Sequence, residues 1–187
     1  MSTSHIDETK AFIPIRIAVL TVSDTRTREN DTSGDTLVER LTAAGHVLAD
    51  RALLRDDVEQ IRGQLKKWIA AKGVDAIITT GGTGLTGRDV TVEAMRPLFE
   101  KEIDGFSALF HQISYAKVGT STIQSRACAG LAGGTFLFAL PGSTGAVKDG
   151  WDGILKSQLD SRHRPCNFVE IMPRLQEHVV PAERKRT

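Results

Sequence analysis

The 187-residue chain is poor in the residues that cross-link small proteins. It has two cysteines, Cys128 and Cys166, too few for a disulfide framework and without the close spacing of a zinc site. Its five histidines are scattered along the chain and also lack the close spacing of a zinc site. A disulfide-rich or zinc-stapled fold is therefore excluded, and we expect a reducing, cytoplasmic environment.

The sequence also lacks a charge imbalance and a long apolar run. Its formal net charge is +1 and its pI is about 7.8, which gives no electrostatic case for a nucleic acid or an anionic membrane as a partner. Residues 1–12 lack the apolar centre of a signal peptide, and no segment has the length of a membrane span. We therefore expect a soluble protein that binds any phosphate group through local contacts.

Apolar runs alternate with amphipathic stretches along the chain, which predicts an α/β protein. The expected fold is a three-layer α/β/α sandwich with a mostly parallel sheet. Strands are expected at 15–22, 47–54 (near an edge), 75–80 and 135–140, and helices at 36–44, 58–71, 90–98, 105–117 and 147–159. The length fits a single domain at 14–170, preceded by a flexible leader at 1–13 and followed by a polar tail at 171–187.

One glycine-rich stretch dominates the sequence. The expected strand at 75–80 runs directly into Gly81-Gly82-Thr83-Gly84, and a helix-compatible segment follows. Glycine lets backbone N–H groups approach a ligand closely, and a helix that begins beyond it adds a positive dipole end. Pro141-Gly142-Ser143 follows the strand at 135–140 in a similar way. Both turns are therefore suited to hold phosphate.

Other interpretations of this glycine loop stay open. Residues 82–87 match the G-x-G-x-x-G dinucleotide fingerprint, which would suggest a nucleotide-dependent oxidoreductase. That fingerprint normally follows the first strand of its unit, with an acidic residue about 20 positions further on. Here the loop follows the third expected strand, and Asp89 lies beside it. A glycine-rich turn without any ligand is the other alternative.

A second candidate binding segment follows the first expected strand. Ser23, Asp24, Ser33 and Gly34 lie in a stretch rich in hydroxyl and charged side chains that is too long for a simple turn. Ligands of open α/β sheets collect beyond the carboxyl ends of the strands, where this loop is expected. These residues are therefore either ligand contacts or part of a solvated loop.

Two acidic residues stand just before expected helices. Asp56 precedes the helix at 58–71, and Asp89 precedes the helix at 90–98. Each could simply cap its helix, because aspartate is a favoured N-cap. From local chemistry alone, a cap and a functional role are both possible.

Four ordered motifs resemble the MoaB/MogA family of molybdenum cofactor biosynthesis, to which the G domain of gephyrin is related. They are Thr79–Gly84, Arg88–Thr91, Ser125-Arg126 and Leu140-Pro141-Gly142, and the stretch at 161–168 is similar to the MoaB branch. The resemblance implies binding of molybdopterin and of Mg²⁺ with ATP or GTP. It also implies transfer of AMP to the terminal phosphate of molybdopterin with release of pyrophosphate. A homotrimer or hexamer, and contact with other molybdenum cofactor enzymes, are implied as well.

The resemblance also assigns roles to residues. The essential acids of the family fall on Asp56 and Asp89, which would hold Mg²⁺ directly or through water. The nucleotide contacts fall on Gly81, Gly82, Thr83, Gly84, Pro141, Gly142 and Ser143. Molybdopterin contacts are placed on Ser125 and Arg126, with Ser23, Asp24, Ser33 and Gly34. Members of the MoaB branch that bind molybdopterin without transferring AMP are the alternative.

Overall fold

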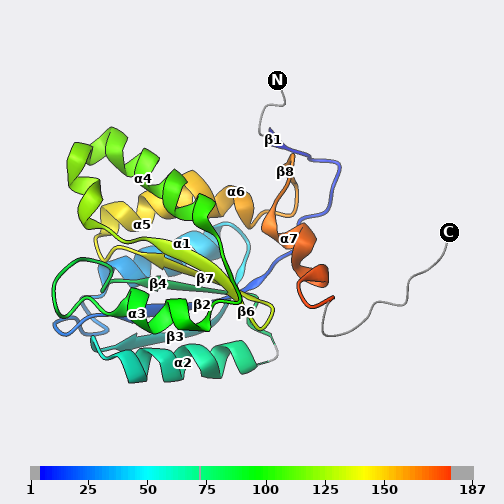
Figure 1. Ribbon diagram of the computed structural model, residues 1–187. Helices are drawn as coiled ribbons and strands as arrows, with labels where there is room; N and C mark the ends of the chain where they lie inside the picture. Colours follow the sequence, from blue (N-terminus) through cyan, green and yellow to red (C-terminus); the bar gives the residue numbers. More distant parts are fainter. Residues whose placement is uncertain (1–4, 72, 178–187) are drawn as a thin grey trace.

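A computed structural model describes residues 5–71 and 73–177 of the chain. Its centre is a six-stranded sheet flanked by helices on both faces (Figure 1). The strands, in their order across the sheet, are β3 (Val47–Leu54), β2 (Arg16–Val22), β4 (Ala76–Thr80), β7 (Thr135–Leu140), β6 (Cys128–Ala132) and β5 (Lys101–Glu102). The first four run parallel, whereas β6 is antiparallel to β7 and β5 is antiparallel to β6. The predicted three-layer fold with a mostly parallel sheet is confirmed.

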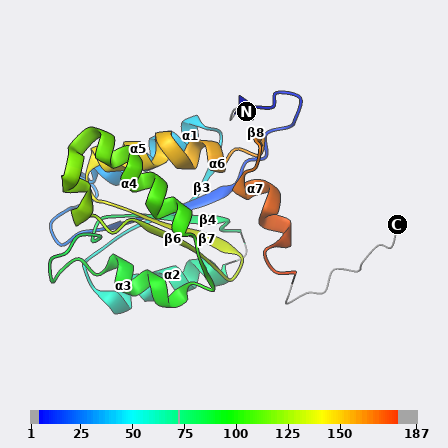
Figure 2. The ribbon, with the colours of Figure 1, turned by 45° about the horizontal axis from the view of Figure 1, so that its top comes forward.

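The two helical layers differ in size (Figure 2). One layer contains α1 (Thr32–Ala43), α4 (Asp104–Val118) and a continuous helical stretch made of α5 (Thr144–Gly150), a π-helical turn (Trp151–Leu155) and α6 (Lys156–Gln158). The other contains α2 (Val58–Ala70) and α3 (Thr91–Met95). Short 3₁₀ segments cover Arg96–Leu98 and Gly119–Gln124.

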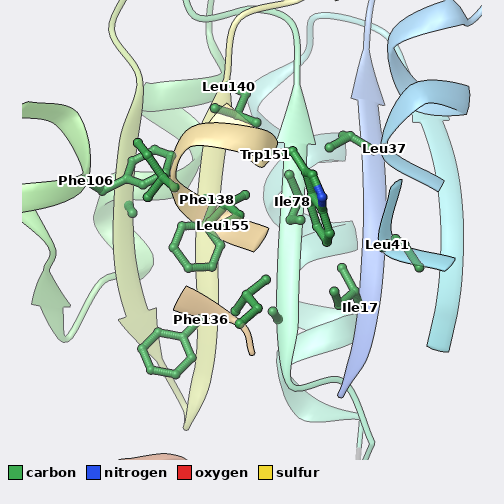
Figure 3. Close-up of a cluster of buried hydrophobic side chains, with 14 of the residues drawn as sticks. Ile17, Leu37, Leu41, Ile78, Phe106, Phe136, Phe138, Leu140, Trp151 and Leu155 are labelled. Atoms are coloured by element: carbon green, nitrogen blue, oxygen red, sulfur yellow. The ribbon is translucent and has the colours of Figure 1, made fainter. Parts of the chain in front are cut away.

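The core lies on both sides of the central strands. On the side of α1 and α5, Trp151 packs near Ile78 and Ile17 (Figure 3). On the other side, Ile77 belongs to a second cluster with Trp68 of α2. Neighbouring residues of β4 therefore face opposite layers, as expected for a strand that is buried on both faces. The packing fixes β2, β4 and β7 side by side, so that the loops after their carboxyl ends meet at one edge of the sheet.

The predicted element positions hold for most of the chain. The strand at 47–54 matches β3, which lies at the sheet edge as expected. The helix predicted at 36–44 begins earlier, at Thr32, because the side chain of Asp31 accepts a hydrogen bond from the Gly34 N–H and caps it there. The strand β6 was not predicted: its sequence, Cys-Ala-Gly-Leu-Ala, has weak strand preference. Pairing with β7 on one side and β5 on the other defines it.

Residues 5–10 contact residues 163–170. Residues 5–13 were expected as a flexible leader, yet β1 (His5–Ile6) pairs with β8 (His163–Arg164), and Lys10 forms an ion pair with Glu170 of α7 (Phe168–Ile171). Of the expected polar tail, residues 171–177 include the 3₁₀ segment Met172–Arg174, and residues 178–187 lie outside the described residues. The domain limits at 13 and 170 stay predictions. Within the described ranges, no helix is both long and apolar enough to cross a membrane.

Candidate functional site

A cleft of about 660 Å³ opens where the loops after β2, β4 and β7 meet. Both glycine turns and both candidate acids border it. Of the residues predicted from the sequence, the following line the cleft: Ser23, Asp56, Gly81, Gly82, Thr83, Gly84, Asp89, Ser125, Pro141, Gly142 and Ser143. The sequence motifs thus converge on one site at the carboxyl edge of the parallel strands, the usual ligand position in such sheets.

The two glycine turns touch each other because Gly81 and Gly142 leave room for the approach. The backbone N–H of Gly81 donates to the carbonyl of Leu140 at 3.1 Å. Gly81 has a φ of +100°, and a Cβ there would lie 2.1 Å from the carbonyl oxygen of Val22. A Cβ on Gly142 would lie 3.2 Å from the Cα of Gly81. Only glycine fits at residue 81, so its identity is required by the backbone before any ligand is considered.

Replacing Gly81 by Ala should therefore destabilise the protein. The positive φ alone costs about 1–3 kcal/mol for a residue with a side chain, and the clash with the Val22 carbonyl adds to it. Chemical denaturation measures the loss. Gly87→Ala is the matched control in the same loop, because a Cβ on Gly87 meets nothing within 4 Å. Equal stabilities for the two variants would show that the contact between Gly81 and β2 does not constrain the loop.

The interpretation of Asp56 and Asp89 as helix caps is wrong for both residues. The N-cap of α2 is Asp57, whose side chain accepts a hydrogen bond from the Gln60 N–H at 2.8 Å. The N-terminus of α3 has no side-chain cap, and Asp89 instead accepts hydrogen bonds from the backbone N–H and the hydroxyl of Thr86. Both carboxylates therefore border the cleft without a role in capping a helix.

The acids have opposite electrostatic environments. Partial burial raises the pKa of Asp56, and the negative charges of Asp24 and Asp89 raise it further. Burial also acts to raise the pKa of Asp89, but hydrogen bonds from Thr86 and from the Gly84 N–H, together with the positive charge of Arg126, outweigh that effect and leave the pKa below its usual range. The cleft thus holds carboxylates that repel one another, and a bound cation would relieve this repulsion.

The two carboxylates of Asp56 and Asp89 suit magnesium better than a metal ion whose ligands must all be protein side chains. Within 5–71 and 73–177, no group of three or more His, Cys, Asp or Glu side chains is arranged to hold a metal ion. Asp24 lies close to the pair but forms a 2.8 Å ion pair with Arg88. Magnesium often binds to one or two carboxylates, with water and substrate phosphates as its other ligands. Asp56 and Asp89 fit that pattern.

Ser125 presents a polar side chain at the edge of the cleft. Its hydroxyl oxygen is buried and makes no hydrogen bond to the described residues. The residue borders both the cleft and a neighbouring hollow of about 780 Å³ between α4 and α5. The ring of His111 contacts the Ser125 carbonyl at 2.9 Å and the Ser107 carbonyl at 2.7 Å, which fixes the backbone at this point. A buried hydroxyl with no partner is costly, and a ligand would satisfy it.

Four predicted site residues do not line the cleft. Asp24 is held by Arg88, as described above. Ser33 and Gly34 lie buried in the first turn of α1, where a Cβ on Gly34 would lie 2.1 Å from a carboxylate oxygen of Asp31. Their positions give them a role in the start of α1, and direct contact with molybdopterin stays a prediction for them.

Arg126 is the fourth of these residues, and its guanidinium is committed to the glycine loop. Its Nε donates to the Gly84 carbonyl at 2.8 Å, one terminal nitrogen donates to the Asp89 carbonyl at 2.9 Å, and the group pairs with Glu93. The residue therefore joins both ends of the loop from 84 to 89. Sequence reasoning missed this structural role because the partners are backbone carbonyl groups, and a sequence motif does not show which carbonyls a side chain will contact.

The dinucleotide fingerprint does not have its usual packing. Its third glycine normally allows a helix to pack closely on a strand. The equivalent residue here, Gly87, has open space where a Cβ would lie, and α3 begins only at Thr91. The match of residues 82–87 to that pattern is therefore not supported by the fold.

The fold and the cleft define a class: an α/β protein with a glycine-lined cleft, bordered by two aspartates, at the carboxyl edge of its parallel strands. Residues 18–161 match the family model described as "Probable molybdopterin binding domain". The chain belongs to the MoaB/MogA family of molybdenum cofactor biosynthesis proteins. The resemblance to this family noted in the sequence is thereby confirmed.

Several similar proteins support this family assignment. The chain is 49% identical over 157 residues to "Molybdenum cofactor biosynthesis protein B" of Escherichia coli (strain K12), covering 84% of this chain and 92% of that protein. A crystal structure of a molybdenum cofactor biosynthesis protein B has 41% identity and a TM-score of 0.78, over 80% of this chain and 94% of the other. The "tungsten cofactor synthesizing protein MoaB from Pyrococcus furiosus" has 36% identity and a TM-score of 0.71, over 77% and 92% of the two chains.

Proposed function

We propose that the cleft binds molybdopterin together with a magnesium nucleotide, and that the protein transfers AMP from ATP to the terminal phosphate of molybdopterin. The observation that carries the proposal is the position of Asp56 and Asp89: neither caps a helix, and both border a cleft formed by two glycine turns. The proposal is also supported by membership of a family whose role is molybdenum cofactor biosynthesis.

The two acids, the glycine turns and Ser125 each have a role in the proposed reaction. Asp56 and Asp89 would hold Mg²⁺, which would supply neutralising charge to the phosphate oxygens of the nucleotide. The backbone N–H groups at 82–83 and 142–143 would bind phosphate oxygens, and the hydroxyl of Ser125 would contact molybdopterin. The attacking phosphate of molybdopterin is already anionic, so alignment and charge neutralisation supply most of the catalysis and no dedicated base is needed.

The direct test is an incubation of the protein with ATP, Mg²⁺ and molybdopterin. We expect one pyrophosphate and one adenylylated molybdopterin for each ATP consumed. Replacing ATP with GTP tests the choice of nucleotide. If molybdopterin binds but neither product forms, the protein is a molybdopterin-binding member of the family without transferase activity. If NAD(P) binds in a separate titration, the oxidoreductase alternative becomes the better one.

We also propose that the protein forms a homotrimer or hexamer. Apolar side chains on α4 and the following 3₁₀ segment support this: Tyr115 is 61% exposed, Val118 is 53% exposed and Ile123 is 76% exposed. Large apolar side chains left exposed along one segment are a feature of protein interfaces. Light scattering of the purified protein would measure the mass of the assembly.

A further inference from the structure

Two positively charged side chains, those of Arg26 and Arg88, line the cleft. The side chain of Arg88 is 79% exposed and pairs with Asp24 at the rim. The side chain of Arg26 is 27% exposed, so it lies deeper. Family resemblance assigned no role to Arg26, and in the sequence it is one of several charged residues in the loop between β2 and α1.

The guanidinium of Arg26 is held in place from two sides. One terminal nitrogen donates to the carbonyl of Gly142 at 2.9 Å, in the turn after β7. The other donates to the hydroxyl of Ser33 in α1 and lies 3.6 Å from a carboxylate oxygen of Asp31. These contacts fix the plane of the group before a ligand arrives, which reduces the entropy lost on binding.

Arg26 still has donors to offer. An arginine carries five N–H groups, and the contacts with Gly142 and Ser33 use two of those of Arg26. Arg126, by contrast, uses its guanidinium on carbonyls of the glycine loop and on Glu93. Of these two arginines, Arg26 alone lines the cleft and keeps N–H donors that make no hydrogen bond to the part of the chain that the structure describes.

We infer that Arg26 binds an anionic phosphate group of the nucleotide beside the Gly142 turn. This inference rests on the proposed function, because it requires a phosphorylated ligand. The acids Asp56 and Asp89 make their side of the cleft repulsive to phosphate unless a cation is present, and the glycine turns supply only neutral amides. The fixed guanidinium of Arg26, in the loop between β2 and α1, supplies charge-assisted hydrogen bonds to phosphate, which are stronger than neutral ones.

The test compares ligands that share one base and differ in charge. Adenosine, AMP and Mg-ATP are titrated by calorimetry into the wild-type protein, R26Q and R28Q. We expect R26Q to weaken Mg-ATP binding by about 10- to 100-fold, as for a lost hydrogen bond to a charged group, and to leave adenosine binding unchanged. R28Q is the matched control: Arg28 is exposed in the same loop and does not line the cleft, so its variant should bind all three ligands like the wild type.

The same titrations separate the possible failures. If R26Q weakens adenosine and Mg-ATP by the same factor, Arg26 only holds the two loops together and the inference is overturned. If the wild type binds none of the nucleotides, the proposed function fails, and the inference fails with it. R26K provides a second variant should R26Q not fold. Lysine keeps the positive charge but lacks the planar guanidinium that donates two parallel hydrogen bonds. Mg-ATP should therefore bind to R26K more weakly than to the wild type, while adenosine binding is unaffected. Wild-type binding of Mg-ATP by R26K would also refute the inference.

Discussion

Replacing Asp56 by Asn should lower the rate of adenylyl transfer by about 10²- to 10³-fold while the protein stays folded, a loss typical of removing one preorganised electrostatic group. The amide keeps the size of the side chain but removes the charge that would hold Mg²⁺ beside Asp89 in the proposed site. Pyrophosphate release at saturating ATP and molybdopterin measures the rate. Asp89→Asn should have an effect of the same order.

Although Asp56→Asn should lower activity, the same substitution should not destabilise the protein. The pKa of Asp56 is raised in the folded state by burial and by the charges of Asp24 and Asp89. The folded state therefore binds the proton more tightly than the unfolded state, and this stabilising contribution is lost as pH rises through the folded pKa. At pH 7 the ionised Asp56 opposes folding. Asp56→Asn should thus leave the melting temperature unchanged or raise it at pH 7, and the difference should vanish in acid.

Asp57→Asn is the matched control for this experiment. Asp57 is the next residue, lies outside the cleft lining and caps α2, and asparagine caps a helix about as well as aspartate. Its activity and stability should remain close to those of the wild type. If Asp56→Asn and Asp57→Asn are equally active, Asp56 has no part in the reaction.

The comparison of Asp56 with Asp57 also shows where sequence reasoning reached its limit. Either residue could have capped α2, because both precede the helix and both are aspartates. The backbone decides between them: Asp57 has an extended conformation, and its side chain reaches the N–H of Gln60. Asp56 is thereby left to face the cleft. Local patterns identify such a pair but do not say which member caps the helix.

The parts of the site that could be predicted are those that local chemistry fixes. Gly81 and Gly142 follow buried strands and have no side chain, so their turns were recognisable in the sequence. Arg126 was identified as a candidate site residue, but its contacts, like those of Arg26, could not be predicted because the partners are distant in the sequence: Gly142 for Arg26, and Gly84 and Glu93 for Arg126. The start of α1 at Thr32 likewise depends on Asp31, whose surroundings come from three different elements.

Those surroundings lead to the largest expected change in stability. The side chain of Asp31 is fully buried, and that of Arg51 on β3 is 8% exposed. Arg51 donates to Asp31 at 2.7 Å, and so does the hydroxyl of Thr21 on β2. The N–H of Gly34 in α1 donates to the second carboxylate oxygen at 3.0 Å. One carboxylate therefore joins β2, β3 and the first turn of α1.

Replacing Arg51 by Met should destabilise the protein by up to about 3–5 kcal/mol, because the buried carboxylate of Asp31 loses its 2.7 Å ion pair and keeps only the more distant Arg26, at 3.6 Å. Chemical denaturation at pH 7 measures the loss. Asp35→Asn is the control, since it removes the other ion pair of Arg51. The side chain of Asp35 is 58% exposed, and an exposed pair contributes only about 0–1 kcal/mol.

The pH dependence should identify Asp31 as the cause. Burial alone would raise the pKa of Asp31, but hydrogen bonds from Arg51, Thr21 and the Gly34 N–H hold it below its usual range. Its stabilising contribution is therefore present above the unfolded pKa and is lost as pH falls through the folded pKa. The gap between the wild type and Arg51→Met should narrow in acid. A gap that stays constant with pH would show that lost packing of the Arg51 side chain, rather than the loss of its charge beside Asp31, causes the destabilisation.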